Sequence, residues 1–183
     1  MAQQRRGRRS RWRRKGAERP IRYLGDPVLR TPTDPVTSFD DDLERLIDDM
    51  FASMYAADGV GLAANQIGVG LSVFVYDCHD DDEEWHTGHV VNPRLVSTSG
   101  EAVTDSEGCL SVPGLHFDTT RAQFAVVEGV DRHGEPIRVE GSGYFGRCLQ
   151  HETDHLIGKV YLDRLDGESR TTALREVRAA QWS

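Results

Sequence analysis

The stretch of sequence that decides the fold runs from Tyr144 to Gly158 and reads YFGRCLQHETDHLIG. Its apolar residues recur at intervals of three and four, which predicts an α-helix with one buried face that ends at Gly158. His151 and His155 are four residues apart, so a helix directs both imidazoles from one face, about 6 Å from each other. Both rings can therefore bind one metal ion, while Glu152 points toward the open side of that ion.

Two histidines leave a catalytic metal site one protein ligand short. Tyr161 stands where the metzincin pattern has its third histidine, so that pattern is not met. Glu176, which lies 21 residues after His155 on an expected short C-terminal helix, would complete a thermolysin-like peptidase site. Cys109 offers a thiolate instead, because the neighbouring Gly108 lets the backbone approach a ligand closely. The residues alone do not decide whether Glu176 or Cys109 is the third ligand.

The first third of the chain contains a second predicted helix. Apolar residues recur with helical spacing from 43 to 54, and the pattern ends before Gly59. Three aspartates at positions 40–42 precede it, at the positive end of the helix dipole. We therefore interpret this acidic cluster as dipole complementation rather than as a metal site.

Short β-branched and aromatic runs in the middle of the chain predict strands at residues 73–76, 90–96, 124–130 and 137–139. Residues 131–134, Asp-Arg-His-Gly, predict a hairpin turn between the last two strands. Because strands crowd the middle and helices lie near both ends, the sequence favours an α+β fold over alternating βαβ units. We expect antiparallel strands packed around a central helix that carries the H-E-T-D-H sequence, with a preceding amphipathic helix and a short C-terminal helix.

Length and composition fit one ordinary domain. The chain has 183 residues, of which 38% are apolar and 28% are charged. It contains no apolar run of about 18 residues and no apolar N-terminal stretch, so we expect a cytoplasmic protein that is neither secreted nor bound to a membrane. Three cysteines are too few for a disulfide framework, which leaves at least one as a candidate ligand or nucleophile.

Charge divides the chain into an arm and a body. Residues 1–22 carry a net charge of +9, whereas the remaining residues carry −17. We expect residues 1–20 to form a basic, disordered extension and residues 21–183 to form a single catalytic domain. The arginine-rich run at 5–15 is of the kind that binds phosphate groups, which leaves a nucleic-acid-binding role open.

Three short motifs occur together in this chain: Gly59 to Gln66 (GVGLAANQ), Glu107 to Ser111 (EGCLS) and Gln150 to His155 (QHETDH). In order and spacing they resemble the three motifs of peptide deformylases, and the resemblance covers roughly residues 21–165. This family removes the formyl group from the N-terminal formylmethionine of nascent bacterial and organellar proteins. The resemblance therefore implies a metal-dependent hydrolase that cleaves a formamide bond in nascent formyl-Met polypeptides.

The resemblance also implies a role for the residues at the metal. Cys109, His151 and His155 would hold one divalent ion and leave a fourth position for water. Glu152 would act as general base toward that water and then protonate the leaving amine. Ferrous iron is the implied metal in the cell, with zinc, nickel or cobalt as alternatives. We also expect transient contact with the ribosome through residues 5–15, and no membrane or DNA partner.

Other residues are assigned to the oxyanion and the substrate. Gln66 and the backbone N–H of Leu110 would donate hydrogen bonds to the oxygen that becomes negative. The stem of Arg147 would form part of the pocket wall while its head reaches solvent. The family tends to place an arginine at this distance after the motif, and a buried carboxylate needs a partner, so the resemblance implies an ion pair between Glu107 and Arg121. The substrate-binding residues implied are Val60, Gly61, Gly108, Tyr144, Arg147 and Cys148.

Overall fold

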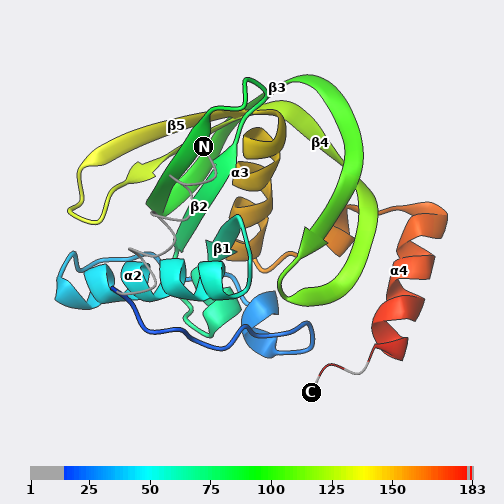
Figure 1. The fold of residues 1–183 in the computed structure, drawn as a ribbon, viewed down its shortest axis with the longest axis horizontal. Helices are drawn as coiled ribbons and strands as arrows, with labels where there is room; N and C mark the ends of the chain where they lie inside the picture. The colour runs from blue at the N-terminus through cyan, green and yellow to red at the C-terminus, as the bar shows by residue number, and fades with distance from the viewer. Residues whose placement is uncertain (1–14, 181, 183) are drawn as a thin grey trace.

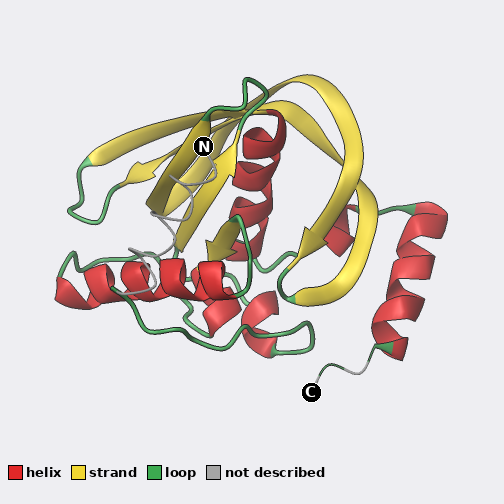
Figure 2. Cartoon of the chain, in the orientation of Figure 1, coloured by secondary structure: helices red, strands yellow, loops and turns green. Residues whose placement is uncertain are grey.

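The computed structural model describes residues 15–180 and 182, which form the predicted α+β fold (Figure 2). One antiparallel sheet has the order β1-β2-β3-β4-β5, so each strand pairs with its neighbour in sequence. Its strands are β1 (Gly61–Ala63), β2 (Val73–His79), β3 (Trp85–Cys109), β4 (Val112–Val130) and β5 (Pro136–Ser142). The helices are α2 (Asp41–Ala56), α3 (Gly143–Leu156) and α4 (Gly167–Ala179), with 3-10 turns η1 (Pro27–Arg30), η2 (Ala64–Ile67) and η3 (Tyr161–Arg164). None of the described helices is long and apolar enough to cross a membrane.

Helix α3 lies in the middle of the molecule, and the long strands β3 and β4 curve round it as one ribbon (Figure 1). Its apolar face is buried through Phe145, Leu149 and Leu156, which recur at the predicted helical spacing. Gly158 follows the helix with a φ of +74°, a left-handed conformation in which glycine is free of strain. The central helix predicted from the sequence is therefore confirmed.

Helix α2 confirms the second predicted helix, and its acidic residues lie at its N-terminus as expected. The Asp40 side chain caps the helix by accepting hydrogen bonds from the backbone N–H groups of Asp42 and Leu43. The stripe that the helix buries contains Leu43, Leu46, Ile47, Met50, Phe51 and Met54. This stripe forms one hydrophobic core with the sheet residues Leu62, Val73, Val75 and Val91.

Strand β2 separates two hydrophobic cores, because successive side chains of a strand point to opposite faces. Val73 and Val75 pack in the core that contains α2. Phe74 and Tyr76 pack in the core that contains the apolar face of α3. The sheet is thus covered by a helix on each face.

Strands β3 and β4 extend much farther than the predicted strands at 90–96 and 124–130. Their pairing continues from Ser97 to Gly108, opposite residues 116–126. Serine, threonine, glycine and acidic residues predominate there, so the sequence lacks the apolar alternation by which strands are recognised. Register shifts interrupt the ladder, and such irregularities bend and twist a strand pair. The curved ribbon carries Cys109, at the end of β3, to the flank of α3.

Residues 15–19 lie along α2. The backbone N–H of Ala17 donates to Asp49 Oδ1 at 2.8 Å, and that of Arg19 donates to Ser53 Oγ at 2.8 Å. The Arg19 guanidinium also pairs with the Asp49 carboxylate at 2.8 Å. Residues 1–14, which contain most of the predicted basic arm, lie outside the described residues. The domain boundary near residue 20 stays a prediction.

Candidate metal centre

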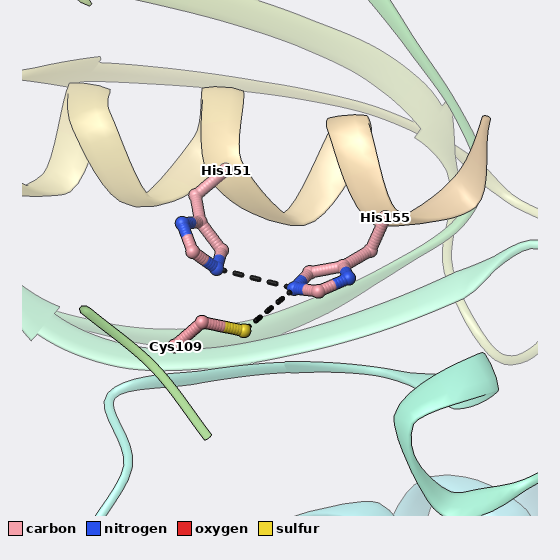
Figure 3. A group of neighbouring side chains, drawn as sticks. All are labelled: Cys109, His151 and His155. Carbon is pink, nitrogen blue, oxygen red and sulfur yellow. Dashed lines mark hydrogen bonds between the residues drawn. The ribbon is translucent and has the colours of Figure 1, made fainter. Parts of the chain in front are cut away.

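Three metal-binding side chains converge where the end of β3 meets α3 (Figure 3). Cys109 Sγ lies 3.3 Å from His155 Nε2, which lies 3.1 Å from His151 Nε2. The two histidines come from successive turns of α3, as their spacing predicts, and the thiol comes from the ribbon. One donor atom from each residue lies within 4.8 Å of the other two.

This donor set fits a divalent transition metal. A tetrahedral ion with bonds of about 2.1 Å to nitrogen and 2.3 Å to sulfur separates its donors by roughly 3.5 Å, close to the separations found here. Burial and the neighbouring His151 lower the pKa of His155 well below its usual value. His155 is therefore a neutral imidazole at neutral pH, the form that binds a metal. One thiolate with two imidazoles suits zinc, iron, nickel and cobalt, so the donors do not select among them.

Glu107 orients one of the two histidines. Its Oε1 lies 2.7 Å from His151 Nδ1, which leaves Nε2 of that ring facing the centre. Burial tends to raise the pKa of Glu107, but hydrogen bonds from His151 and Arg121 hold it below its usual value. The carboxylate is thus ionised and can accept the Nδ1 proton of His151, which fixes the ring tautomer and orientation.

The predicted ion pair of Glu107 with Arg121 is confirmed. Arg121 Nη2 donates to Glu107 Oε1 at 2.6 Å, and Nε donates to Oε2 at 3.1 Å. The same guanidinium donates through Nη1 to Asp154 Oδ2 at 2.6 Å. Asp154 lies between the two histidines in sequence, so Arg121 ties β4 to the helical turn that carries them.

Glu152 lies in the same site with a free carboxylate oxygen. The residue is buried, and among residues 15–180 its Oε2 finds no hydrogen-bond partner. Burial raises the pKa of Glu152 to about 7. Gly61 makes room for this side chain, because a Cβ at that position would overlap Glu152 Oε1. A buried carboxylate in this state can take up and release a proton near neutral pH.

Gln66 and Leu110 line the same cavity as the donor group. Gln66 is held by its Oε1, which accepts from the backbone N–H of Ala63 at 2.9 Å. Its Nε2 donates to Ser111 Oγ at 3.1 Å and approaches Cys109 Sγ at 3.5 Å. Leu110 follows Cys109 in the turn between β3 and β4 and lines the same cavity. The two residues predicted to stabilise an oxyanion therefore lie beside the converging donors.

A cavity of about 450 Å³ opens onto this group. Of the predicted site residues, the cavity is lined by Val60, Gly61, Gln66, Gly108, Cys109, Leu110, Tyr144, Arg147, Cys148, His151 and Glu152. The sequence did not identify Ser106, Pro113, Gly114 and His116, which also line it. These residues belong to the polar part of the ribbon, where no strand was predicted and no motif extends. The only sequence feature that could have identified these four residues is their proximity to the Glu107–Ser111 run.

The expectation that the head of Arg147 reaches solvent is wrong. Its side chain is 8% exposed, and Nη1 donates to Glu107 Oε2 at 2.9 Å and to the Thr119 carbonyl oxygen at 2.7 Å. The ribbon instead arches over this turn of the helix and presents a carboxylate and backbone carbonyls to the guanidinium.

Two other candidate ligand groups do not join the centre. Glu176 is exposed on α4, and the donor group in the described part of the chain consists of the cysteine and the two histidines without it. Asp80 and Glu84, in the turn between β2 and β3, lie close to His86 on β3. There Asp80 Oδ1 accepts from the backbone N–H groups of Asp82 and Glu84, so the cluster is explained by the turn.

Comparisons with known proteins agree with one another. A family model described as Polypeptide deformylase matches residues 18–171. The chain is 56% identical over 169 residues to Peptide deformylase 2 of Streptomyces avermitilis, a match that covers 92% of this chain and 91% of that protein. It is 55% identical over 175 residues to peptide deformylase of Mycolicibacterium paratuberculosis, covering 89% of each. The crystal structure of a peptide deformylase from Legionella pneumophila matches with a TM-score of 0.80 and 45% identity, covering 89% of this chain and 95% of that chain.

Proposed function

This chain belongs to the peptide deformylase family, hydrolases that remove the formyl group from nascent peptides, and from that premise we propose a role for each residue of the cavity. Cys109, His151 and His155 bind one divalent metal ion. Glu152 is the proton carrier of the reaction. The observation that supports this proposal most directly is a buried carboxylate oxygen that no residue in the described part of the chain hydrogen-bonds, in the same cavity as three converging metal donors.

The reaction adds water across the C–N bond of a formamide. When bound, the ion supplies Lewis-acid chemistry that lowers the pKa of water from 15.7 toward about 7. Glu152 accepts a proton from the attacking water and passes it to the leaving amine, so that formate and a free N-terminus are released. Its pKa of about 7, raised by burial, suits a group that must accept and return a proton near neutral pH.

Gln66 and Leu110 stabilise the oxygen that becomes negative as water adds to the formyl carbon. Gln66 offers Nε2 and Leu110 offers its backbone N–H. Because the Gln66 amide is anchored through Oε1 to β1, its donor is already oriented before substrate binds. Removing one such donor commonly costs about 3 kcal/mol of transition-state stabilisation.

The methionine side chain binds in the cavity beside α3. The residues that we assign to it are Val60, Gly61, Gly108, Tyr144, Arg147 and Cys148. Within the described residues, strand β1 is at the edge of the sheet and pairs with β2 alone, so the backbone at Gly61 can pair with an extended peptide. A peptide on this edge places its N-terminal formyl group toward the metal donors.

We propose ferrous iron as the metal in the cell. Iron ligated by a thiolate is sensitive to oxidation, so the protein must be purified anaerobically for the test. The experiment measures formate release from a formyl-Met peptide and the metal content of the same sample. Formate release in proportion to bound metal supports the proposed function, and a metal-loaded protein that releases no formate contradicts it.

Gly61→Ala should lower kcat for deformylation by about a hundredfold. The new Cβ would overlap Glu152 Oε1 and lie 2.9 Å from Cys148 Sγ, so the proton carrier must move. Gly70→Ala is the matched control, because a Cβ at Gly70 meets no atom within 4 Å in the described part of the chain. Steady-state kinetics on both variants check this, and equal kcat in the two variants would contradict the assigned role of Gly61.

The arginine-rich arm is proposed to bring the enzyme to the ribosome. Residues 5–14 contain seven arginines, whose contacts with RNA phosphates release counterions and depend on salt. Deletion of residues 2–14 keeps the contacts of Ala17 and Arg19 with α2. The deletion should reduce co-sedimentation with ribosomes at low salt and leave hydrolysis of a free formyl peptide unchanged. Equal co-sedimentation of both proteins would reject the proposal.

A further inference from the structure

Arg147 is a buried cation in the cavity wall to which the proposed mechanism gives no step. Nη1 donates to Glu107 Oε2 at 2.9 Å and to the Thr119 carbonyl oxygen at 2.7 Å. Nη2 donates to the Val103 carbonyl oxygen at 2.9 Å. Because Val103 belongs to β3 and Thr119 to β4, one side chain of α3 fastens both strands of the ribbon to the helix.

Arg147 and His151 hold different oxygens of the same carboxylate. The two residues are four apart on α3, so both face Glu107 from one side of the helix. His151 Nδ1 lies 2.7 Å from Oε1, and Arg147 Nη1 lies 2.9 Å from Oε2. Rotation of the carboxylate breaks both contacts. The guanidinium of Arg147 therefore limits the positions from which Glu107 can hold the His151 ring.

Arg147 also contributes to the balance of buried charges around Glu107. Arg121 contacts both oxygens of Glu107, but it also donates to the buried Asp154 at 2.6 Å. Asp154 also pairs with Arg164, whose side chain is partly exposed. Arg121 and Arg147 are therefore the two buried guanidinium groups that contact Glu107. Buried ion pairs are weak evidence for a gain in stability, whereas charge-assisted bonds fix geometry well.

We propose that Arg147 is a positioning residue for this reaction, acting on His151 through Glu107 and holding the ribbon against α3. The inference rests on the proposed function, because that function assigns His151 to the metal. Hydrogen-bonding partners of a metal-binding histidine typically change metal affinity or activity by about ten to a hundredfold. Since Arg147 acts through Glu107, its loss should affect metal affinity and kcat more than KM.

Arg147→Met removes the guanidinium and keeps an apolar stem in the cavity wall. We expect about tenfold weaker Co²⁺ binding, measured by competition with a chelator, and about tenfold lower kcat with KM changed less than about threefold. Arg147→Lys keeps the charge without the forked donors and should recover part of both losses. Arg138→Met is the matched control, because Arg138 is an exposed arginine on β5 that pairs with Glu128. It should leave both quantities unchanged.

Glu107→Gln tests whether Arg147 acts along the proposed route. In that background, Arg147→Met should weaken Co²⁺ binding less than about twofold, because the carboxylate that connects the two side chains is gone. An equal loss in both backgrounds would overturn the proposal, as would unchanged Co²⁺ affinity in folded Arg147→Met protein. Thermal unfolding reports folding, and Arg147→Lys allows the same comparison if the methionine variant does not fold. The measurement of Co²⁺ affinity does not require turnover. If the wild-type protein binds Co²⁺ but does not deformylate a formyl-Met peptide, the proposed function is rejected, and the effect of Arg147 on Co²⁺ affinity is tested independently.

Discussion

Glu152→Gln should retain a full complement of metal while kcat for deformylation falls by about a thousandfold. Glutamine keeps the shape of the side chain that Gly61 accommodates, but it cannot accept the proton of the attacking water. General acid–base groups contribute about 10² to 10⁴ to a rate, and Glu152 is assigned both transfers. Metal analysis and formate release, measured on the same anaerobic preparation, test this expectation.

The matched control for this variant is Glu140→Gln, which makes the same change at an exposed position on β5. It should leave kcat and metal content at the wild-type values. If Glu152→Gln turned over at the wild-type rate, another group would have to carry the proton. Loss of metal from Glu152→Gln would instead identify this carboxylate as a ligand.

Cys109→Ala should lose its metal, with an affinity at least about a hundredfold weaker than that of the wild type. The variant removes the thiolate from a three-residue donor set and leaves only the two imidazoles. Metal per chain after dialysis against a chelator is the measurement. Deformylation should fall in proportion to the metal lost.

Two further variants serve as controls for the metal loss expected of Cys109→Ala. Cys78→Ala removes another free thiol, which is buried on β2 outside the donor group, and should retain the metal. Glu176→Ala should also retain it, because this carboxylate is exposed on α4. Metal retained by Cys109→Ala but lost by Glu176→Ala would restore the thermolysin-like alternative that the residues alone left open.

Helices α2 and α3 could be predicted from the sequence because each buries a regular apolar stripe. In α3 the stripe through Phe145, Leu149 and Leu156 fixes which face is buried, and so the direction of His151 and His155. The placement of these two imidazoles side by side follows from helix geometry alone. The third donor required the resemblance to a family, because nothing near Cys109 has a period that indicates where it lies.

The ribbon could not be predicted, because backbone pairing and not apolar alternation holds its polar half in place. Residues such as Ser97 and Thr104 are compatible with strand, turn or loop when read singly. Because the ribbon was not predicted, the head of Arg147 was expected to reach solvent, and His116 could not be assigned to the cavity. The pair of Glu107 with Arg121 was predicted correctly because the family tends to place an arginine at this distance after the motif and a buried carboxylate requires a cation.

A sheet in which every strand pairs with its neighbour in sequence can assemble through successive hairpins, each of which closes a short loop. The donor set cannot form in this way, because Cys109 and His155 are 46 residues apart and α3 follows the last strand. The set is therefore complete only when α3 is docked against the ribbon. A partly folded chain can hold its sheet without offering all three ligands, so an ion that requires them binds the native state and shifts the folding equilibrium toward it by mass action.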